Sequence, residues 1–162
     1  MTARIGFCCK FLKTTDVGND LLLCETDPNI NGRSTTITWL NRQTVTAAEQ
    51  RLWDIMQHNI AAAGRLVETV GAMPANQRMV RVGSDLLPAY TEPNWSYFWQ
   101  RSDVRDYCAQ HFAEVGARAR ELDVRLSFHP GQFCCLASDS DDVVRRSIEE
   151  FEYHTDCARW MG

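Results

Sequence analysis

His129 is the residue of this chain whose type and position most directly suggest chemistry. It ends a segment, residues 124–129, in which apolar and polar side chains alternate, a pattern that predicts a β-strand. The next residues, Pro130 and Gly131, break the strand, so the imidazole is expected at the carboxyl end of the strand. A lone histidine is more often structural than functional. The surrounding elements must therefore decide between a site and a packed side chain.

Helical segments flank this strand on both sides. An amphipathic helix that begins at Ser102 ends just before the strand, and a further helix begins at Ser140. The second helix carries a predicted apolar stripe that includes Ile148 and Phe151. The chain therefore alternates between strand and helix, which predicts an α/β fold.

Two further strands are expected upstream, near residues 4–9 and 79–84, with a helix between them that opens at a capping box starting at Thr46. Parallel strands alternating with helices are typical of TIM-type (β/α)8 barrels, whose active sites lie at the carboxyl ends of the strands. His129 falls at such an end. Only about three βα units fit into the 162 residues, whereas a closed barrel typically needs about 250. Residues 1–162 are therefore predicted to form one domain, an incomplete barrel.

Composition sets limits on partners and compartment. The chain has 44% hydrophobic and 23% charged residues, no apolar run long enough to cross a membrane and no recognisable signal peptide, so we expect no membrane partner. Its seven cysteines include two adjacent pairs but no C-x-x-C motif, which predicts reduced core thiols in an intracellular, cytoplasmic protein. The net charge of −4 does not favour nucleic-acid binding, although a local basic rim would permit it.

Residues 11–43 are predicted to be a long irregular loop. Loops of this length inside compact domains are often functional. Basic side chains lie within and beside it, and we select Lys10 and Arg33 as candidate contacts to a phosphate backbone. A solvated loop with scattered charges is an equally good interpretation.

Two other side chains have the chemistry of metal ligands. Glu92, in an aromatic-rich loop after the second strand, is a candidate ligand. His154 lies about 14 residues into the last helix, roughly 20 Å along its axis at 1.5 Å per residue. We therefore expect His154 to lie far from His129 and to be a packed histidine rather than a second ligand.

Several segments together resemble the UV damage endonuclease family. They are Arg4-Ile5-Gly6-Phe7, His58-Asn59, Ser84-Asp85-Leu86-Leu87-Pro88, Leu126-Ser127-Phe128-His129-Pro130-Gly131-Gln132-Phe133 and Glu152-Tyr153-His154. The segments follow the order of the family at compatible spacing across nearly the whole chain.

The resemblance implies a TIM-type barrel that holds divalent metals, usually Mn²⁺ with Mg²⁺ as an alternative, and nicks DNA on the 5′ side of ultraviolet photoproducts and other lesions. It implies that His129 is a metal ligand and that Gln132 and Phe133 enter the duplex at the lesion. Glu92 stands where many members have a histidine, and a carboxylate still suits Mn²⁺ or Mg²⁺. Where the family tends to offer an asparagine, this chain has Phe11.

The resemblance also implies that most residues of the metal site lie beyond Gly162, on later strands of the barrel. A metal cluster that activates water needs several anionic ligands, and His129 with Glu92 alone would bind a divalent ion weakly. No catalytic residue is therefore assigned within residues 1–162.

Three functions are open at this point. The first is a metal-dependent UV damage endonuclease acting on double-stranded DNA, active when further strands, from this protein or from a second polypeptide, complete the barrel. The second is a catalytically inactive half-barrel that binds damaged DNA or another partner. The third is a different metal-using TIM barrel, such as a sugar isomerase, which the segment from His129 to Phe133 disfavours.

Overall fold

The computed structural model describes residues 3–18, 22–131 and 134–162. The described strands and helices follow the order β1, β2, β3, α1, α2, β4, α3, α4, β5, α5, with two short 3₁₀ turns before and after β4. The strands are β1 (Phe7–Cys8), β2 (Leu12–Asp16), β3 (Leu22–Thr26), β4 (Met79–Gly83) and β5 (Arg125–His129). The helices are α1 (Ile37–Leu40), α2 (Val45–Gly71), α3 (Ser96–Gln100), α4 (Ser102–Glu121) and α5 (Asp141–Met161).

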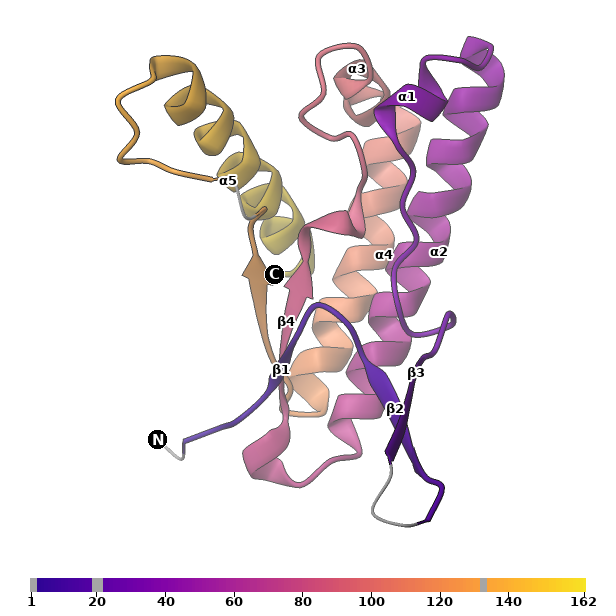
Figure 1. The fold of residues 1–162 in the computed structure, drawn as a ribbon, viewed down its shortest axis with the longest axis vertical. Helices are drawn as coiled ribbons and strands as arrows, with labels where there is room; N and C mark the ends of the chain where they lie inside the picture. Colours follow the sequence, from indigo (N-terminus) through magenta and orange to yellow (C-terminus); the bar gives the residue numbers. More distant parts are fainter. Residues whose placement is uncertain (1–2, 19–21, 132–133) are drawn as a thin grey trace.

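The central sheet contains three parallel strands in the order β1-β4-β5. Val80 of β4 lies opposite Phe7 of β1 and Leu126 of β5, and Gly83 lies opposite His129. The three strands that the sequence predicts are therefore present and parallel, and each is followed by a long helix (Figure 1). All three strands end at the same edge of the sheet, which is the arrangement that brings their terminal side chains together.

The two faces of the sheet differ in character. Val80 and Val82 are buried against the helices, whereas Arg81 between them is exposed on the opposite face. On β5, Arg125 and His129 are exposed as well. The alternation follows from strand geometry, since successive side chains point to opposite faces. The face away from the helices is consequently polar.

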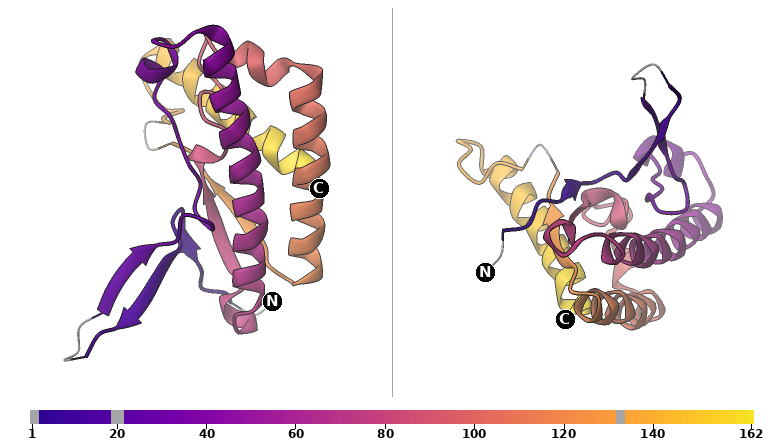
Figure 2. Two further views of the ribbon diagram at one scale, coloured as in Figure 1. Left: turned by 90° about the vertical axis from the view of Figure 1, so that its right-hand side faces the viewer. Right: turned by 90° about the horizontal axis from the view of Figure 1, so that it is seen from below.

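The three long helices cover the apolar face. α4 lies between α2 and α5 and packs against both (Figures 1 and 2). The buried core that they share with the sheet includes Leu52, Met56, Val67, Val80, Trp99, Phe112, Tyr153 and Cys157.

The segment predicted to be an irregular loop contains a β-hairpin instead. β2 and β3 pair antiparallel, with Thr14 opposite Cys24, and the hairpin projects away from the sheet and helices (Figure 2, left). Both of its faces are exposed where they are described. No apolar face marks the strands, so the sequence has no alternation of apolar and polar residues to reveal them.

Helix starts and burial differ from expectation in detail. α2 begins two residues earlier than predicted, because Thr44 rather than Thr46 is its N-cap and accepts a hydrogen bond from Ala47 N at 3.3 Å. α5 begins where expected, but its buried side matches the predicted apolar stripe only in part, at Met161. Ile148 and Phe151 are 46% and 41% exposed, and the buried residues are Ser147, Tyr153, His154, Cys157 and Met161. Polar side chains thus take part of the buried face, and two of them, Ser147 and Tyr153, bond to the loops that follow the strands.

Close contact between α4 and α5 depends on Gly116, because a Cβ atom added there would overlap the carbonyl of Met161. We expect Gly116→Ala to destabilise the fold by about 1–3 kcal/mol, as overpacking outweighs the gain in helix propensity. Gly64→Ala is the matched control, since the nearest atom to its added Cβ, Val115 Cγ2, lies at 3.8 Å. That variant should gain about 0.5–1 kcal/mol. Urea unfolding of both variants measures the difference, and equal stabilities would contradict this packing.

Candidate functional site at the strand ends

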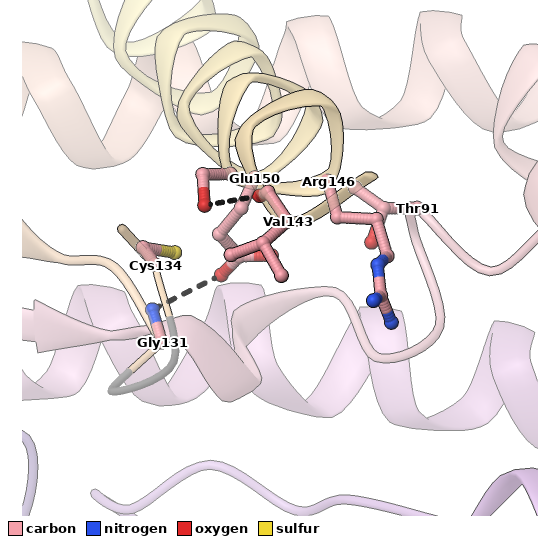
Figure 3. A pocket seen from close by; sticks show the side chains of 7 residues that line it. Thr91, Gly131, Cys134, Val143, Arg146 and Glu150 are labelled. Carbon is pink, nitrogen blue, oxygen red and sulfur yellow. Dashed lines mark hydrogen bonds between the residues drawn. The ribbon is translucent and has the colours of Figure 1, made fainter. Parts of the chain in front are cut away.

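The chain that leaves β5 borders a pocket of about 340 Å³ against the first turns of α5 (Figure 3). Gly131 N donates a hydrogen bond to Glu150 Oε1 at 3.3 Å, and Cys135 N donates to Ser147 Oγ at 2.8 Å. These bonds attach the described residues on either side of positions 132 and 133 to α5. Those two candidate lesion contacts themselves lie outside the described residues.

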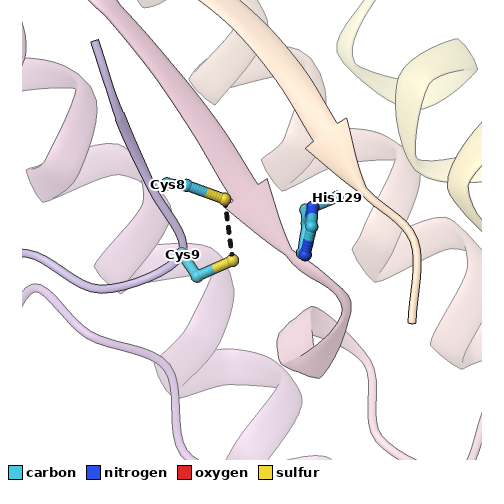
Figure 4. A group of neighbouring side chains, drawn as sticks. All are labelled: Cys8, Cys9 and His129. Carbon is cyan, nitrogen blue, oxygen red and sulfur yellow. Dashed lines mark hydrogen bonds between the residues drawn. The ribbon is translucent and has the colours of Figure 1, made fainter. Parts of the chain in front are cut away.

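His129 meets two thiols at the strand ends. Cys8 ends β1, Cys9 follows it, and the ligand atoms of both cysteines and of His129 all lie within 4.8 Å of one another (Figure 4). The two sulfur atoms are 3.1 Å apart. Cys8 and His129 are exposed and Cys9 is half-buried, so solvent and ions can reach the group.

Two backbone features bring these donors together. Neighbouring side chains in a strand normally point to opposite faces, but Cys9 has a φ of 65°, which turns its sulfur back to the side of Cys8. β1 and β5 are not neighbours, so their side chains must meet across the end of β4. The residue there is Gly83, where a Cβ would stand 3.7 Å from Cys9 Sγ and 2.9 Å from Asp85 Oδ1.

The Cys9 thiol is a weak acid in this setting. Burial raises the pKa of Cys9 to about 11, and the hydrogen bond and charge of Cys8 add to the rise, while Lys10 opposes it. The Cys9 thiol therefore keeps its proton near pH 7.

Lys10 and Asp85 lie beside this group. Lys10 Nζ is 3.0 Å from Asp85 Oδ2 and 3.5 Å from Gly32 O. Both side chains are partly exposed, so the pair adds little to stability, at most about 1 kcal/mol. The ion pair holds the lysine over the strand ends, while the exposed Arg33 lies on the adjoining loop.

Asn59 is a site residue that the sequence interpretation missed. It is 1% exposed, and its Oδ1 accepts from Arg33 N at 2.7 Å. Its Nδ2 lies 2.9 Å from both Arg33 O and Asp85 O and 3.0 Å from Leu86 O. One amide therefore joins α2, the loop before α1 and the turn after β4. Its position in the middle of a long helix gives no local signal for this role.

Tyr153 holds the same turn from the opposite side. Its hydroxyl accepts from Leu87 N at 2.9 Å and donates to Ser84 O at 3.1 Å. The side chain is buried, and desolvation raises the pKa of its phenol well above the usual range. The hydroxyl therefore stays protonated and can serve both bonds.

Comparison with known proteins identifies the family. A family model described as UV-endonuclease UvdE matches residues 12–162. The chain belongs to the UvdE family of UV-endonucleases.

The relatives of this UvdE chain are longer than it is. A UV DNA damage endonuclease of Bacillus velezensis is 31% identical over 84 residues, which are 52% of this chain and 25% of the relative. One of a Nostoc species is 26% identical over 134 residues, 82% of this chain and 40% of the relative. The crystal structure of SacUVDE matches with a TM-score of 0.68 at 21% identity, over 99% of this chain and 46% of that one. It shows the shared fold. The chain spans less than half the length of each.

Glu92 has surroundings of its own in this UvdE chain. It lies in a cavity bordered by Ser84, Tyr153 and Glu150, and its carbonyl accepts from Ser96 N at 2.8 Å. Within the described residues, the donor group that includes His129 consists of His129 and the two thiols, without Glu92. Its role as a ligand remains a prediction.

His154 lies much closer to the last strand than its helical position suggested. Its ring centroid is 5.6 Å from that of Phe128, the neighbour of His129, and Nδ1 is 2.8 Å from Glu150 O. Phe128 and His129 point to opposite faces of β5, so the expected distance between His154 and His129 stays a prediction. The approach to Phe128 arises because α5 runs back towards the sheet (Figure 1). The expectation of a packed histidine is confirmed, since the residue is 5% exposed.

Gly162 follows the last turn of α5, where it contacts α4 and lies outside the group formed by Cys8, Cys9 and His129. Its φ of 81° is left-handed, and its carbonyl accepts a hydrogen bond from Arg120 Nη1 of α4 at 2.6 Å. The same guanidinium nitrogen donates to Met161 O at 2.8 Å, so one arginine binds the end of α5 to α4. That most metal-site residues of the whole protein lie beyond Gly162 stays a prediction, because they would lie outside this sequence.

The donors gathered around His129 do not suit manganese. Mn²⁺ prefers carboxylate, carbonyl and water oxygens, whereas thiolate sulfur favours softer ions. Among described residues the group offers two sulfurs and one imidazole. The manganese that the resemblance implies would need oxygen donors that this group lacks.

Replacing Asn59 tests the proposed positioning of the strand ends. Asn59→Ala leaves four backbone groups without their partner, and we expect a loss of about 1–3 kcal/mol. Hydrogen exchange at the Arg33 amide, which Asn59 Oδ1 protects, should accelerate. Gln57→Ala, at an exposed position of α2, is the control and should change stability by less than about 0.5 kcal/mol. Unchanged exchange at Arg33 would contradict the role of Asn59.

Proposed function

We propose that the protein containing this chain is a DNA repair endonuclease that nicks double-stranded DNA on the 5′ side of ultraviolet photoproducts in a metal-dependent reaction. The observation that carries the proposal is the UvdE family match over residues 12–162, with His129 at the carboxyl edge of the parallel sheet. The relatives are named as endonucleases of UV damage. Because the chain spans only part of them, the activity belongs to the whole protein.

The strand ends would form one side of the DNA site. Arg81 is exposed on the polar face of the sheet, and Lys10 and Arg33 lie at its carboxyl edge, so basic side chains border the strand ends despite the acidic net charge. Arginine and lysine neutralise backbone phosphates, which supports a location for the duplex near this edge. Lys10 would reach a phosphate by leaving Asp85.

The ion of the nuclease would be Mn²⁺, or Mg²⁺, with His129 and Glu92 as the ligands from this chain. In such nucleases a divalent ion supplies an activated water and neutralises developing charge. His129, exposed at the end of β5, is accessible for ligation. The remaining oxygen donors would come from residues beyond Gly162 or from a second polypeptide.

Further strands would extend the sheet. In the described part of the chain β5 pairs with β4 alone, which leaves one edge of β5 open to another parallel strand. That strand would belong to the same protein at its natural length or to a second polypeptide.

Among the described residues, no helix is long and apolar enough to span a membrane.

His129→Ala tests the nuclease proposal in the protein purified at its natural length. Loss of a direct metal ligand should lower the nicking rate of UV-irradiated duplex by more than about 100-fold, since even residues that only support ligands cost about 10–100-fold. Binding to the damaged duplex should persist. His111→Ala, on the outer surface of α4, should nick normally. Nicking by His129→Ala at the unaltered rate would contradict the proposal.

The same assay separates the nuclease from a half-barrel that only binds DNA. Binding without metal-dependent nicking by the natural-length protein would favour the binding module. The 162-residue chain alone should not nick with Mn²⁺, because its described residues gather too few oxygen donors.

A lesion-contact role for Gln132 and Phe133 rests on the family resemblance. An amide can replace the hydrogen bonds of an orphaned base and a ring can replace lost stacking. The double variant Gln132→Ala, Phe133→Ala should reduce the preference for damaged over intact duplex by about 1–3 kcal/mol. Competition binding with the two duplexes measures the preference, and an unchanged ratio would remove these residues from lesion recognition.

A further inference from the structure

We propose that Cys8, Cys9 and His129 form a binding site for a thiophilic divalent ion, Zn²⁺ above all. The donor set is two sulfurs and one imidazole nitrogen, with all three ligand atoms within 4.8 Å of one another. Such a site goes beyond the nuclease reaction, and binding by this group does not depend on nicking.

A tetrahedral zinc centre sets the spacing that these three donors would have to reach. Zn–S bonds of about 2.3 Å and Zn–N bonds of about 2.0–2.1 Å place two sulfurs roughly 3.8 Å apart and a sulfur and a nitrogen roughly 3.5 Å apart. The sulfurs are now 3.1 Å apart, so they must separate by about 0.7 Å. Cys8 and His129 are exposed, which leaves their side chains room to rotate.

The backbone is shaped so that the donors converge. The left-handed conformation of Cys9, with a φ of 65°, is uncommon outside glycine and asparagine, and it alone puts two consecutive cysteine sulfurs on one side of the chain. Gly83 at the end of β4, the strand between β1 and β5, presents no side chain to separate them.

The chemistry of the donors selects the ion. A site of nitrogen and sulfur donors binds Zn²⁺ more tightly than Mn²⁺. Thiolate ligands increase this preference for the softer ion. Each thiol gives up its proton to solvent when it binds the ion. Three protein ligands leave a fourth position for water, as in open zinc sites.

One consequence rests on the proposed nuclease function. His129 is also the expected ligand of the nuclease ion, so zinc bound with Cys8 and Cys9 would occupy that imidazole. Zn²⁺ should then inhibit manganese-dependent nicking, and the Cys8→Ser, Cys9→Ser protein should resist that inhibition.

Cobalt titration of the purified 162-residue chain tests binding itself, in a reducing buffer free of thiols. Co²⁺ replaces Zn²⁺ and gives a sulfur-to-cobalt charge-transfer band when thiolates bind it. We expect one ion per chain, a band that added Zn²⁺ removes, and affinity at least about tenfold weaker in Cys8→Ser, Cys9→Ser and His129→Ala.

The second adjacent pair of cysteines provides a matched control. Cys134 and Cys135 are consecutive and accessible, and no histidine joins them in a donor group among the described residues. Cys134→Ser with Cys135→Ser should leave cobalt binding unchanged. The proposed site would be overturned if Cys8→Ser or Cys9→Ser bound cobalt as tightly as the unaltered chain. It would also be overturned if the control variant lost as much cobalt affinity as the site variants. Circular dichroism of each variant distinguishes lost binding from lost folding.

The two proposals fail separately. Absence of the thiolate band would remove the zinc site and leave the nicking test of His129→Ala untouched. Absence of nicking would remove the nuclease and leave the cobalt titration valid.

Discussion

Two buried hydrogen-bonding side chains hold the turn after β4, and the arrangement of the strand ends depends on them. Asn59 binds this turn from α2, and Tyr153 binds it from α5. Asp85 lies in the turn and pairs with Lys10, which follows the cysteines of β1. Because buried polar groups are costly when unpaired, this network favours a single geometry. The helices therefore stabilise the fold and also position the chemistry.

The relative lengths of helices and strands explain why sequence reasoning found only part of this site. α2 has 27 residues and spans about 40 Å, whereas the five residues of β4 span about 17 Å. The helices therefore extend past the sheet, and residues in their middle, such as Asn59, lie level with the strand ends. His154 is near β5 for the same reason. Hydrophobic periodicity gives the register of a helix but not its offset along the sheet.

Local pattern was sufficient for the three parallel strands and for His129, because alternation and the Pro130-Gly131 break are written in adjacent residues. It was insufficient for the β2–β3 hairpin, which buries no apolar face. It was also insufficient for Cys8 and Cys9, which the sequence suggested were core thiols. Their convergence on His129 requires a left-handed backbone at Cys9 and a strand pairing order that no local pattern specifies.

The parallel strand ends gather Cys8, Cys9 and His129, and the central proposal is that these three residues bind one ion. X-ray absorption at the zinc edge, on the chain loaded with one equivalent of Zn²⁺, tests it most directly. We expect two sulfur neighbours at about 2.3 Å and an imidazole nitrogen at about 2.0–2.1 Å, with the remaining position filled by a light atom. A first shell made only of nitrogen and oxygen would contradict it.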